Sequence, residues 1–288
     1  MTPIKDELIV KFSSFFNKLP HKWGCWNCGM EKIPSGYIFT CRNETSKFNN
    51  EFFGRKTPSD VRWERYCPSL VYLDHNFHYL DSKPAKIVNN ELLEDVRVFS
   101  FNNHLFTTGT RKNRQVGRVD QFLAALEGDT LIMLPFKHNF PLHQKNWNTI
   151  IHNGQLYFEQ SISRPRCIVK YTAEGLKTIN ETNYRSLPNL RGNCQTIKLP
   201  DYYLAVYHNH SWRRYYHFFA LLDKKPPFKI IGVTDQLRFQ SADASPIQFV
   251  TGIVKEGDDI IVSFGRQDAD NYVSRVKLNQ ILSLIKKI

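Results

Sequence analysis

The chain has no apolar run that approaches the roughly 18–20 residues of a membrane-spanning helix. Its first residues, MTPIKDELIVKF, place Lys5, Asp6 and Glu7 where a secretory signal requires an apolar stretch. We therefore expect a cytoplasmic protein without a membrane span.

Several familiar catalytic and nucleotide-binding motifs are missing from the sequence. It contains no Walker loop, no GxGxxG before a helix, no HExxH and no GxSxG nucleophile elbow. Glycine and proline number only 14 each, which excludes collagen-like and linker-like chains. Hydrophobic residues make up 41% of the chain and charged residues 23%, so intrinsic disorder is excluded as well.

Cysteine is sparse, with six residues in 288. Only Cys25-Trp-Asn-Cys28 has the spacing of a metal site, and Cys41 and His21 are candidates for the two further ligands that a structural zinc requires. No second Cys-x-x-Cys follows. We therefore predict buried or idle thiols rather than a metal site.

Aromatic residues and positive charge are abundant instead. Aromatics make up 14% of the chain, which favours strands and the stacking of flat ligands. The formal net charge is +12, which attracts phosphates, nucleic acids or anionic membranes, although a merely basic protein has the same balance. The segment SWRRYYHFF (211–219) mixes basic and aromatic residues, but no nucleic-acid-binding motif accompanies it, and we predict no nucleic-acid partner.

Five segments repeat one pattern, two β-rich runs around a polar turn. The turns contain Asn, Asp, Gly or Pro, so each segment is expected to form a β-hairpin. The turns recur at intervals of about 45 residues, which suits propeller blades of four short strands. We predict an all-β, five-bladed β-propeller; a β-sandwich with evenly spaced hairpins is the alternative. The five segments are 69–80, 97–109, 148–161, 195–208 and 251–265.

The ends of the chain have a different pattern. Residues 6–19 and 278–288 carry apolar side chains at helical spacing, so we expect short N- and C-terminal helices packed on the rim. We divide the chain into an N-terminal extension, residues 1–60, and a catalytic propeller, residues 61–288.

Polar residues cluster just before the first strand of each hairpin. The innermost strands of a propeller begin at one mouth of the central channel, so these clusters should converge into one concave site. A second polar set follows the second strand in some repeats. The substrate-binding candidates are Arg65, Glu94, Arg97, Lys145, Asn146, Trp147, Arg191, His208, Gln248, Arg266 and Asp268.

Asp95 is the predicted catalytic residue. In an extended strand Glu94 and Asp95 point to opposite faces, and Asp95 shares a face with Arg97. A carboxylate beside an arginine keeps a low pKa and stays ionised, which suits a base or support for an oxocarbenium-like centre. Salt bridges between blades are the structural alternative for both carboxylates.

The other candidates divide into cations and aromatics. Arg65, Lys145 and Arg191 would make the same mouth cationic and suited to a phosphate, unless they pack against carboxylates. Trp147 is expected to form the floor of a sugar site by stacking on the apolar face of the sugar. A position in the hydrophobic core is equally compatible with the sequence.

The segment EDVRVFSFNNHLFTTGT (94–110) resembles the E-D-P-R-x-F … hairpin … G-T signature of five-bladed propeller carbohydrate-active enzymes, the inverting mannoside phosphorylases and related mannosyltransferases. The resemblance extends roughly from Arg65 to Leu278, and Val96 stands where the family commonly has proline. It implies an axial sugar site, with Asp95 as the general acid or base of inverting transfer and with cationic groups that hold a phosphate.

From these observations we predict an inverting glycosyltransferase. It would move a sugar from a phosphate-activated donor, a nucleotide-sugar or a sugar 1-phosphate, to a glycan acceptor. The alternatives are a glycoside hydrolase or phosphorylase of the same fold and a non-catalytic glycan-binding propeller. A hydrolase needs a second carboxylate, for which Asp235 and Asp268 are candidates. No cofactor is predicted beyond a divalent metal that a nucleotide-sugar donor would bring; Asp268-Ala-Asp270 has suitable spacing but is also typical of a turn.

Overall fold

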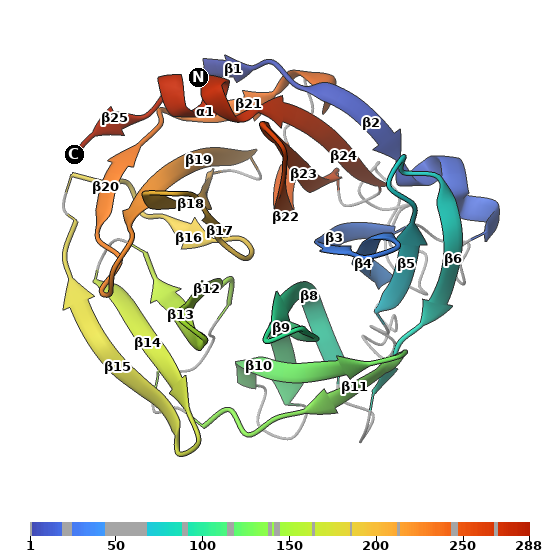
Figure 1. Ribbon diagram of the computed structural model, residues 1–288, viewed down its shortest axis with the longest axis horizontal. Coiled ribbons are helices and arrows are strands. Elements are labelled where there is room, and N and C mark those ends of the chain that lie inside the picture. The colour runs from blue at the N-terminus through green and yellow to red at the C-terminus, as the bar shows by residue number, and fades with distance from the viewer. Residues whose placement is uncertain are drawn as a thin grey trace.

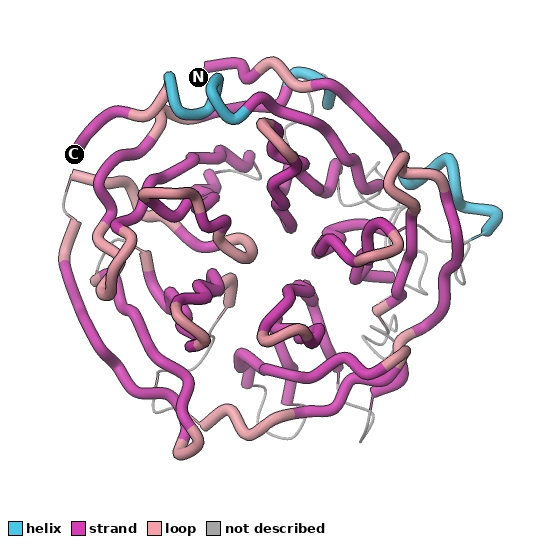
Figure 2. The backbone as a smooth tube through the Cα atoms, viewed as in Figure 1, coloured by secondary structure: helices cyan, strands magenta, loops and turns pink. Residues whose placement is uncertain are grey.

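The residues that the structure describes form a ring of five β-sheets around a common axis (Figures 1 and 2). The predicted all-β propeller is therefore confirmed. The computed structural model describes residues 2–18, 25–43, 68–87, 92–113, 118–137, 140, 145–162, 165–184, 186–211, 214–242, 247–267 and 270–288. No helix among these residues is long and apolar enough to cross a membrane.

Four of the sheets are antiparallel apart from one strand of the second sheet, and in each of them the strand named first below lies toward the centre of the ring (Figure 1). The first sheet contains β3 (Cys25–Ile33), β4 (Gly36–Asn43), β5 (Ser69–Leu73) and β6 (Tyr79–Pro84). The second contains β8 (Leu92–Phe101), β9 (His104–Asn113), β10 (Arg118–Glu127), β11 (Thr130–Met133) and the added parallel strand β7 (Lys86–Ile87). The third contains β12 (Asn148–His152), β13 (Gln155–Ser161), β14 (Arg166–Thr172) and β15 (Gly175–Thr182). The fifth contains β22 (Gln248–Glu256), β23 (Asp259–Arg266), β24 (Asp270–Lys277) and β2 (Glu7–Lys11).

The fourth sheet is the largest, with eight strands. Its inner part contains β16 (Arg191–Gly192), β17 (Ile197–Lys198), β18 (Tyr202–Ser211) and β19 (Arg214–Asp223). Its outer part contains β20 (Ile230–Val233), β21 (Leu237–Phe239), β1 (Thr2–Ile4) and β25 (Lys286–Lys287).

The polar turns form the predicted hairpins because their residues accept a positive φ. Asn102 and Asn103 have φ of 48° and 63° between β8 and β9, and Gly257 has φ of 57° between β22 and β23. Hairpins 97–109, 148–161 and 251–265 are the inner two strands of their sheets, whereas 69–80 forms the outer two strands of the first sheet.

An apolar cluster fills each of the five interfaces between neighbouring sheets, which closes the ring. Burial of apolar surface on both faces of every sheet is what a lone hairpin cannot achieve. One pair of buried residues from each interface is Phe39 and Ile261, Ile38 and Val98, Phe99 and Phe158, Ile168 and Phe218, and Phe219 and Val262.

The N-terminal residues differ from the sequence-based expectation. Residues 7–11 form β2, which pairs with β24, and only Phe12–Lys18 form a helix, η1, of the 3-10 type. The prediction of one helix over 6–19 is wrong for residues 7–11 because the free edge of β24 offers backbone partners. A second 3-10 helix, η3 (Gln240–Ala242), precedes β22, and the C-terminal helix α1 (Leu278–Ser283) ends before β25.

Residues 25–43 also lie inside the propeller. They form β3 and β4, the inner strands of the first sheet, which β5 and β6 complete. The expected boundary near residue 60 therefore does not separate an extension from the propeller.

Candidate active site

Asp95 lies on a bulge of the inner strand β8. Glu94 pairs with Thr110 and Arg97 pairs with Thr108, so Asp95 and Val96 together face the single residue Gly109. Asp95 takes a φ of 54°, a left-handed backbone conformation that is uncommon for a residue with a side chain. The predicted strand alternation is wrong at this point, since the bulge turns both carboxylates toward the same neighbour.

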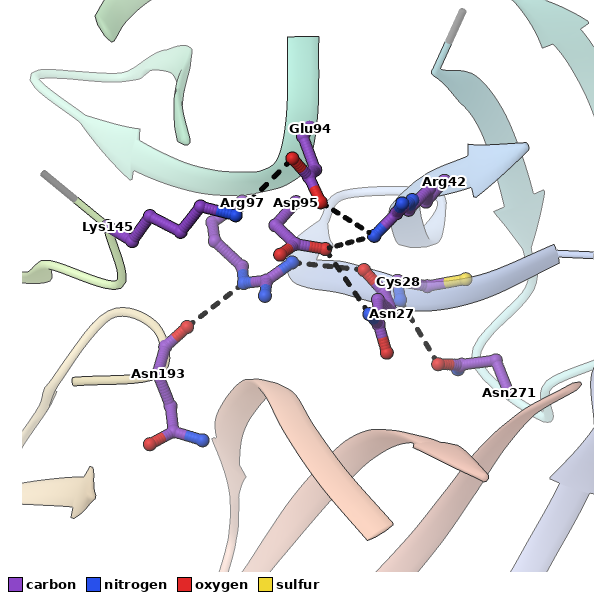
Figure 3. A network of polar contacts seen from close by, with 9 residues as sticks. All are labelled: Asn27, Cys28, Arg42, Glu94, Asp95, Arg97, Lys145, Asn193 and Asn271. Atoms are coloured by element: carbon purple, nitrogen blue, oxygen red, sulfur yellow. Dashed lines mark hydrogen bonds and ion pairs between the residues drawn. The ribbon is translucent and has the colours of Figure 1, made fainter. Parts of the chain in front are cut away.

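That neighbour is Arg42 at the end of β4. Its Nη1 atom lies 3.0 Å from Oε1 of Glu94 and 3.6 Å from Oδ1 of Asp95 (Figure 3). The side chains of Glu94, Asp95 and Arg42 are 9%, 13% and 15% exposed, so the two ion pairs are largely shielded from water but still reach the surface. Such shielding strengthens the attraction between the charges.

Asn27 approaches Asp95 from a matching bulge in β3. The register between β3 and β4 shifts between Trp26 and Gly29, and Asn27 has a φ of 51°. Its Nδ2 atom donates to Oδ1 of Asp95 at 3.2 Å (Figure 3). The first two sheets thus meet through two bulges that face each other.

The surroundings of Asp95 set its charge. Burial raises the pKa of this carboxyl, but the nearby Arg42, Arg97 and Lys145 outweigh burial and hold the pKa below its usual value. Asp95 is therefore ionised at neutral pH, as the sequence predicted from its arginine neighbour.

Arg97 joins the inner strands of several sheets. It is 4% exposed, and it donates from Nε to the carbonyl oxygen of Asn193 at 2.9 Å and from Nη1 to that of Asn27 at 3.0 Å (Figure 3). Its guanidinium also lies 5.5 Å from the ring centroid of Phe249, in cation–π geometry. Burial lowers the pKa of Arg97, and the Asp95 carboxylate works against this effect.

A buried polar chain holds the Asn193 loop in place. Oδ1 of Asn148 accepts hydrogen bonds from the backbone N–H groups of Asn193, at 2.6 Å, and Cys194, at 3.1 Å. Nδ2 of Asn148 donates to Glu159, whose other carboxylate oxygen lies 2.6 Å from Nε of Arg166. Arg97 therefore binds a carbonyl that is itself fixed by the third sheet.

His208, a substrate-binding candidate, belongs to this buried support. It is 1% exposed, and its Nδ1 atom lies 3.0 Å from Oδ1 of Asn193. Burial, followed by the nearby His217 and Arg191, lowers the pKa of His208 well below its usual value, so the ring is neutral at physiological pH.

Lys145 connects the carboxylates with a neighbouring cavity. Its Nζ atom lies 3.4 Å from Oε2 of Glu94. Lys145, Asn146 and Arg191 line a cavity of about 410 Å³ together with Gln160, Ser161, Ile162, Asn189 and Leu190. The structure thus brings the adjacent candidates Lys145 and Asn146 together with the distant Arg191, and it gives this cavity two cationic side chains.

Other candidates take structural positions. Trp147 is 1% exposed and packs against Phe158 and neighbouring rings, so the prediction that it floors a sugar site is wrong. The amide of Gln248 bonds to both the N–H and the C=O of Phe239. Arg266 places its guanidinium 5.6 Å from the ring centroid of Tyr272.

No described atom of the remaining candidates lies in the site. Arg65 and Asp268 lie outside the described residues. Asp235, a candidate second carboxylate, pairs with Lys286 near the outer strands β20 and β25. Among the described residues, the grouped side chains that suit a metal ion are Cys25, Cys28 and Cys41, and Glu94 and Asp95 are not among them.

Sequence reasoning missed Asn27 and Arg42. Both lie in the segment expected to be an extension. A usable signal was present, because two apolar runs flank the turn Pro34-Ser35-Gly36 as in the other hairpins.

No protein-family model and no curated protein matches this chain. Solved structures do resemble it. A β-1,2-mannobiose phosphorylase from Listeria innocua, in complex with β-1,2-mannobiose, has a TM-score of 0.66 at 16% identity, over 91% of this chain and 92% of that chain. A putative glycosidase from Bacteroides thetaiotaomicron has a TM-score of 0.65 at 14% identity, over 89% and 88%. A structure described under the GH130 family of mannoside phosphorylases, which contains hydrolases of β-1,2 mannosidic linkages in Candida mannan, has a TM-score of 0.62 at 12% identity, over 90% and 86%. At these identities the likeness shows the propeller fold.

Proposed function

We propose that this protein is an inverting glycoside phosphorylase, which cleaves a glycoside with phosphate and, in reverse, joins a sugar 1-phosphate to an acceptor hydroxyl. The proposal keeps the phosphate-activated donor expected from the sequence. It replaces the transferase as the main interpretation, because the similar structures are named as phosphorylases and glycoside hydrolases. The observation that supports it most directly is the shielded Asp95 carboxylate beside the cations Arg42 and Lys145. Lys145 also lines the neighbouring cavity.

The cavity lined by Lys145 and Arg191 is the proposed phosphate subsite. Two cationic side chains from different sheets can bind a phosphate dianion by charge-assisted hydrogen bonds. Hydrolysis would instead need a carboxylate that activates water across the sugar ring. The position of Asp235 on the outer strands speaks against that residue in this role.

Asp95 is the proposed acid–base group. In synthesis the ionised carboxylate accepts the proton of the acceptor hydroxyl, the hydroxyl oxygen attacks the anomeric carbon, and the phosphate leaves with the bonding electron pair. In phosphorolysis a phosphate oxygen attacks the anomeric carbon, and the leaving oxygen receives the proton from Asp95. The two directions share one transition state, so one group serves both.

Phosphate binding would prepare Asp95 for the cleavage direction. Lys145 is one of the cations that lower the pKa of Asp95. A bound phosphate would offset its charge, and burial, which raises the pKa of Asp95, would then act with less opposition. The same bound anion therefore favours the protonated carboxyl that phosphorolysis requires.

The decisive assay is turnover of β-1,2-mannobiose, the disaccharide in the Listeria structure, with and without inorganic phosphate. We expect phosphate-dependent release of α-mannose 1-phosphate, because inversion converts a β-glycoside into an α-phosphate. Asp95→Asn should abolish turnover, whereas Asp129→Asn, a matched change in an ion pair with Lys86, should not.

Three other outcomes would overturn the proposal. Release of free mannose independent of phosphate would indicate a hydrolase. Binding of glycans without turnover of any β-mannoside would indicate a binding propeller. Transfer from a nucleotide-sugar alone would restore the transferase interpretation.

A further inference from the structure

Three thiols in the first sheet form a group that the proposed reaction does not use. Cys25, Cys28 and Cys41 are each 0% exposed, and their sulfur atoms all lie within 4.8 Å of one another. They belong to the apolar cluster between the first and fifth sheets, beside Phe12 and Met30. Proteins of this size commonly bury single thiols as small hydrophobes, but three sulfurs at one point are a different arrangement.

The backbone is shaped so that the thiols meet. In a regular strand residues 25 and 28 would point to opposite faces, because the side-chain period is two. The bulge in β3, with Asn27 in its left-handed conformation, cancels that alternation. On β4, Arg42 pairs with Trp26 and Thr40 with Gly29, so Cys41 lies opposite the bulge between the two other cysteines.

We propose that Cys25, Cys28 and Cys41 bind a zinc ion as thiolates. Thiolate sulfur is the ligand that thiophilic d10 ions such as zinc prefer. With Zn–S bonds of about 2.3 Å in tetrahedral geometry, neighbouring sulfurs lie about 3.8 Å apart, which is compatible with the observed grouping within 4.8 Å. The three cysteines fill three of zinc's four positions. His21, the other ligand candidate from the sequence, lies outside the described residues.

The binding step balances without a further reactant. Each of the three thiols gives up its proton to solvent, and each thiolate donates an electron pair to Zn²⁺, so no oxidant or reductant is needed. The product carries one net negative charge.

The ion would stabilise the bulge that supports Asp95. The bulge is held from the fifth sheet, where Thr251 and Ser263 donate to the carbonyl oxygen of Cys28 at 2.7 and 2.8 Å, and Oδ1 of Asn271 accepts from its N–H at 3.1 Å. Asn27, between the two cysteines, contacts both Asp95 and Arg97. The zinc is therefore a positioning element, distinct from the reacting groups.

The test measures the metal directly, in the absence of substrate, so its outcome does not depend on the proposed phosphorylase activity. Elemental analysis of the purified full-length protein should give about one zinc per chain, and X-ray absorption should show about three sulfur neighbours. Cys28→Ser and Cys41→Ser should lose the metal. Cys167→Ser, a matched change of a buried cysteine in the third sheet, should retain it.

Two results would overturn the inference. The first is a reduced wild-type protein that contains no zinc and takes up neither Zn²⁺ nor Co²⁺, the latter followed by thiolate-to-cobalt charge-transfer absorption. The second is an intact mass lower by two hydrogens, together with peptide mapping that places the disulfide among these three cysteines. If the serine variants fail to fold, the metal content and sulfur count of the wild type still decide.

Discussion

Replacement of Gly109 with alanine is expected to displace the β8 bulge that contains Asp95 while the propeller stays folded. A Cβ at position 109 would lie 2.8 Å from the carbonyl oxygen of Asp95 and 3.0 Å from that of Glu94. Both oxygens belong to backbone, so no side-chain rotation relieves the contact, and β8 must move away from β9. Overpacking of this kind typically costs about 1–3 kcal/mol. A displacement of Asp95 approaching 1 Å would lower kcat by up to about 100-fold.

Urea unfolding and steady-state phosphorolysis measure the two effects separately. Gly128→Ala is the matched control, because Gly128 lies in the turn between β10 and β11 with a φ of 61° and nothing within 4 Å of an added Cβ. That change should cost about 1 kcal/mol through backbone strain alone and leave kcat unchanged. Wild-type kcat in Gly109→Ala, or an equal loss of kcat in both variants, would show that the bulge does not position the reacting carboxylate.

Three further predictions concern charges. Lys145→Ala should raise the KM for phosphate roughly tenfold or more, through loss of a charged hydrogen bond, with a smaller effect on kcat in initial-rate measurements. Arg166→Met should destabilise the protein by about 3–5 kcal/mol in urea unfolding, because the buried Glu159 carboxylate, 2.6 Å away, loses its countercharge; a second change, Glu159→Gln, should recover part of the loss. The pKa of Asp95 is lower in the folded state than in the unfolded state, where it lies near 4. The ionised carboxylate therefore stabilises the folded protein above about pH 4, and this stabilisation is lost as the pH falls through the folded-state pKa. The stability advantage of wild type over Asp95→Asn should therefore be constant from pH 5 to 7 and shrink below about pH 4, and an advantage that grows on acidification would contradict the sign of this shift.

The hairpins were predictable because their signals are local. Turn residues such as Asn102 and Asn103, between β-rich runs, specify a reversal within a few residues. The first inner hairpin, β3–β4, escaped the repeat pattern because its outer partners begin only at Ser69. The long segment between Asn43 and Ser69 interrupts the regular spacing of the hairpins along the sequence.

The site was only partly predictable, because its geometry depends on bulges and on contacts between sheets. Glu94, Arg97 and Lys145, three of the charged residues around Asp95, could be named from their position before a hairpin. The positive φ of Asp95 could not be predicted, since a local pattern favours plain alternation and the bulge depends on the space that Gly109 leaves on the paired strand. Arg42 reaches Asp95 from a different sheet, and no sequence spacing encodes that contact.

The pairing of β2 with β24 has a consequence for biosynthesis. Residues 7–11 are synthesised long before their partners, residues 270–277, because most of the propeller lies between them in the sequence. Until β24 is made, the edge of β2 is exposed to other nascent chains, and the fifth sheet of the ring is incomplete. Completion of the native state is thus a late, long-range event, and folding of this protein should be slow for its size.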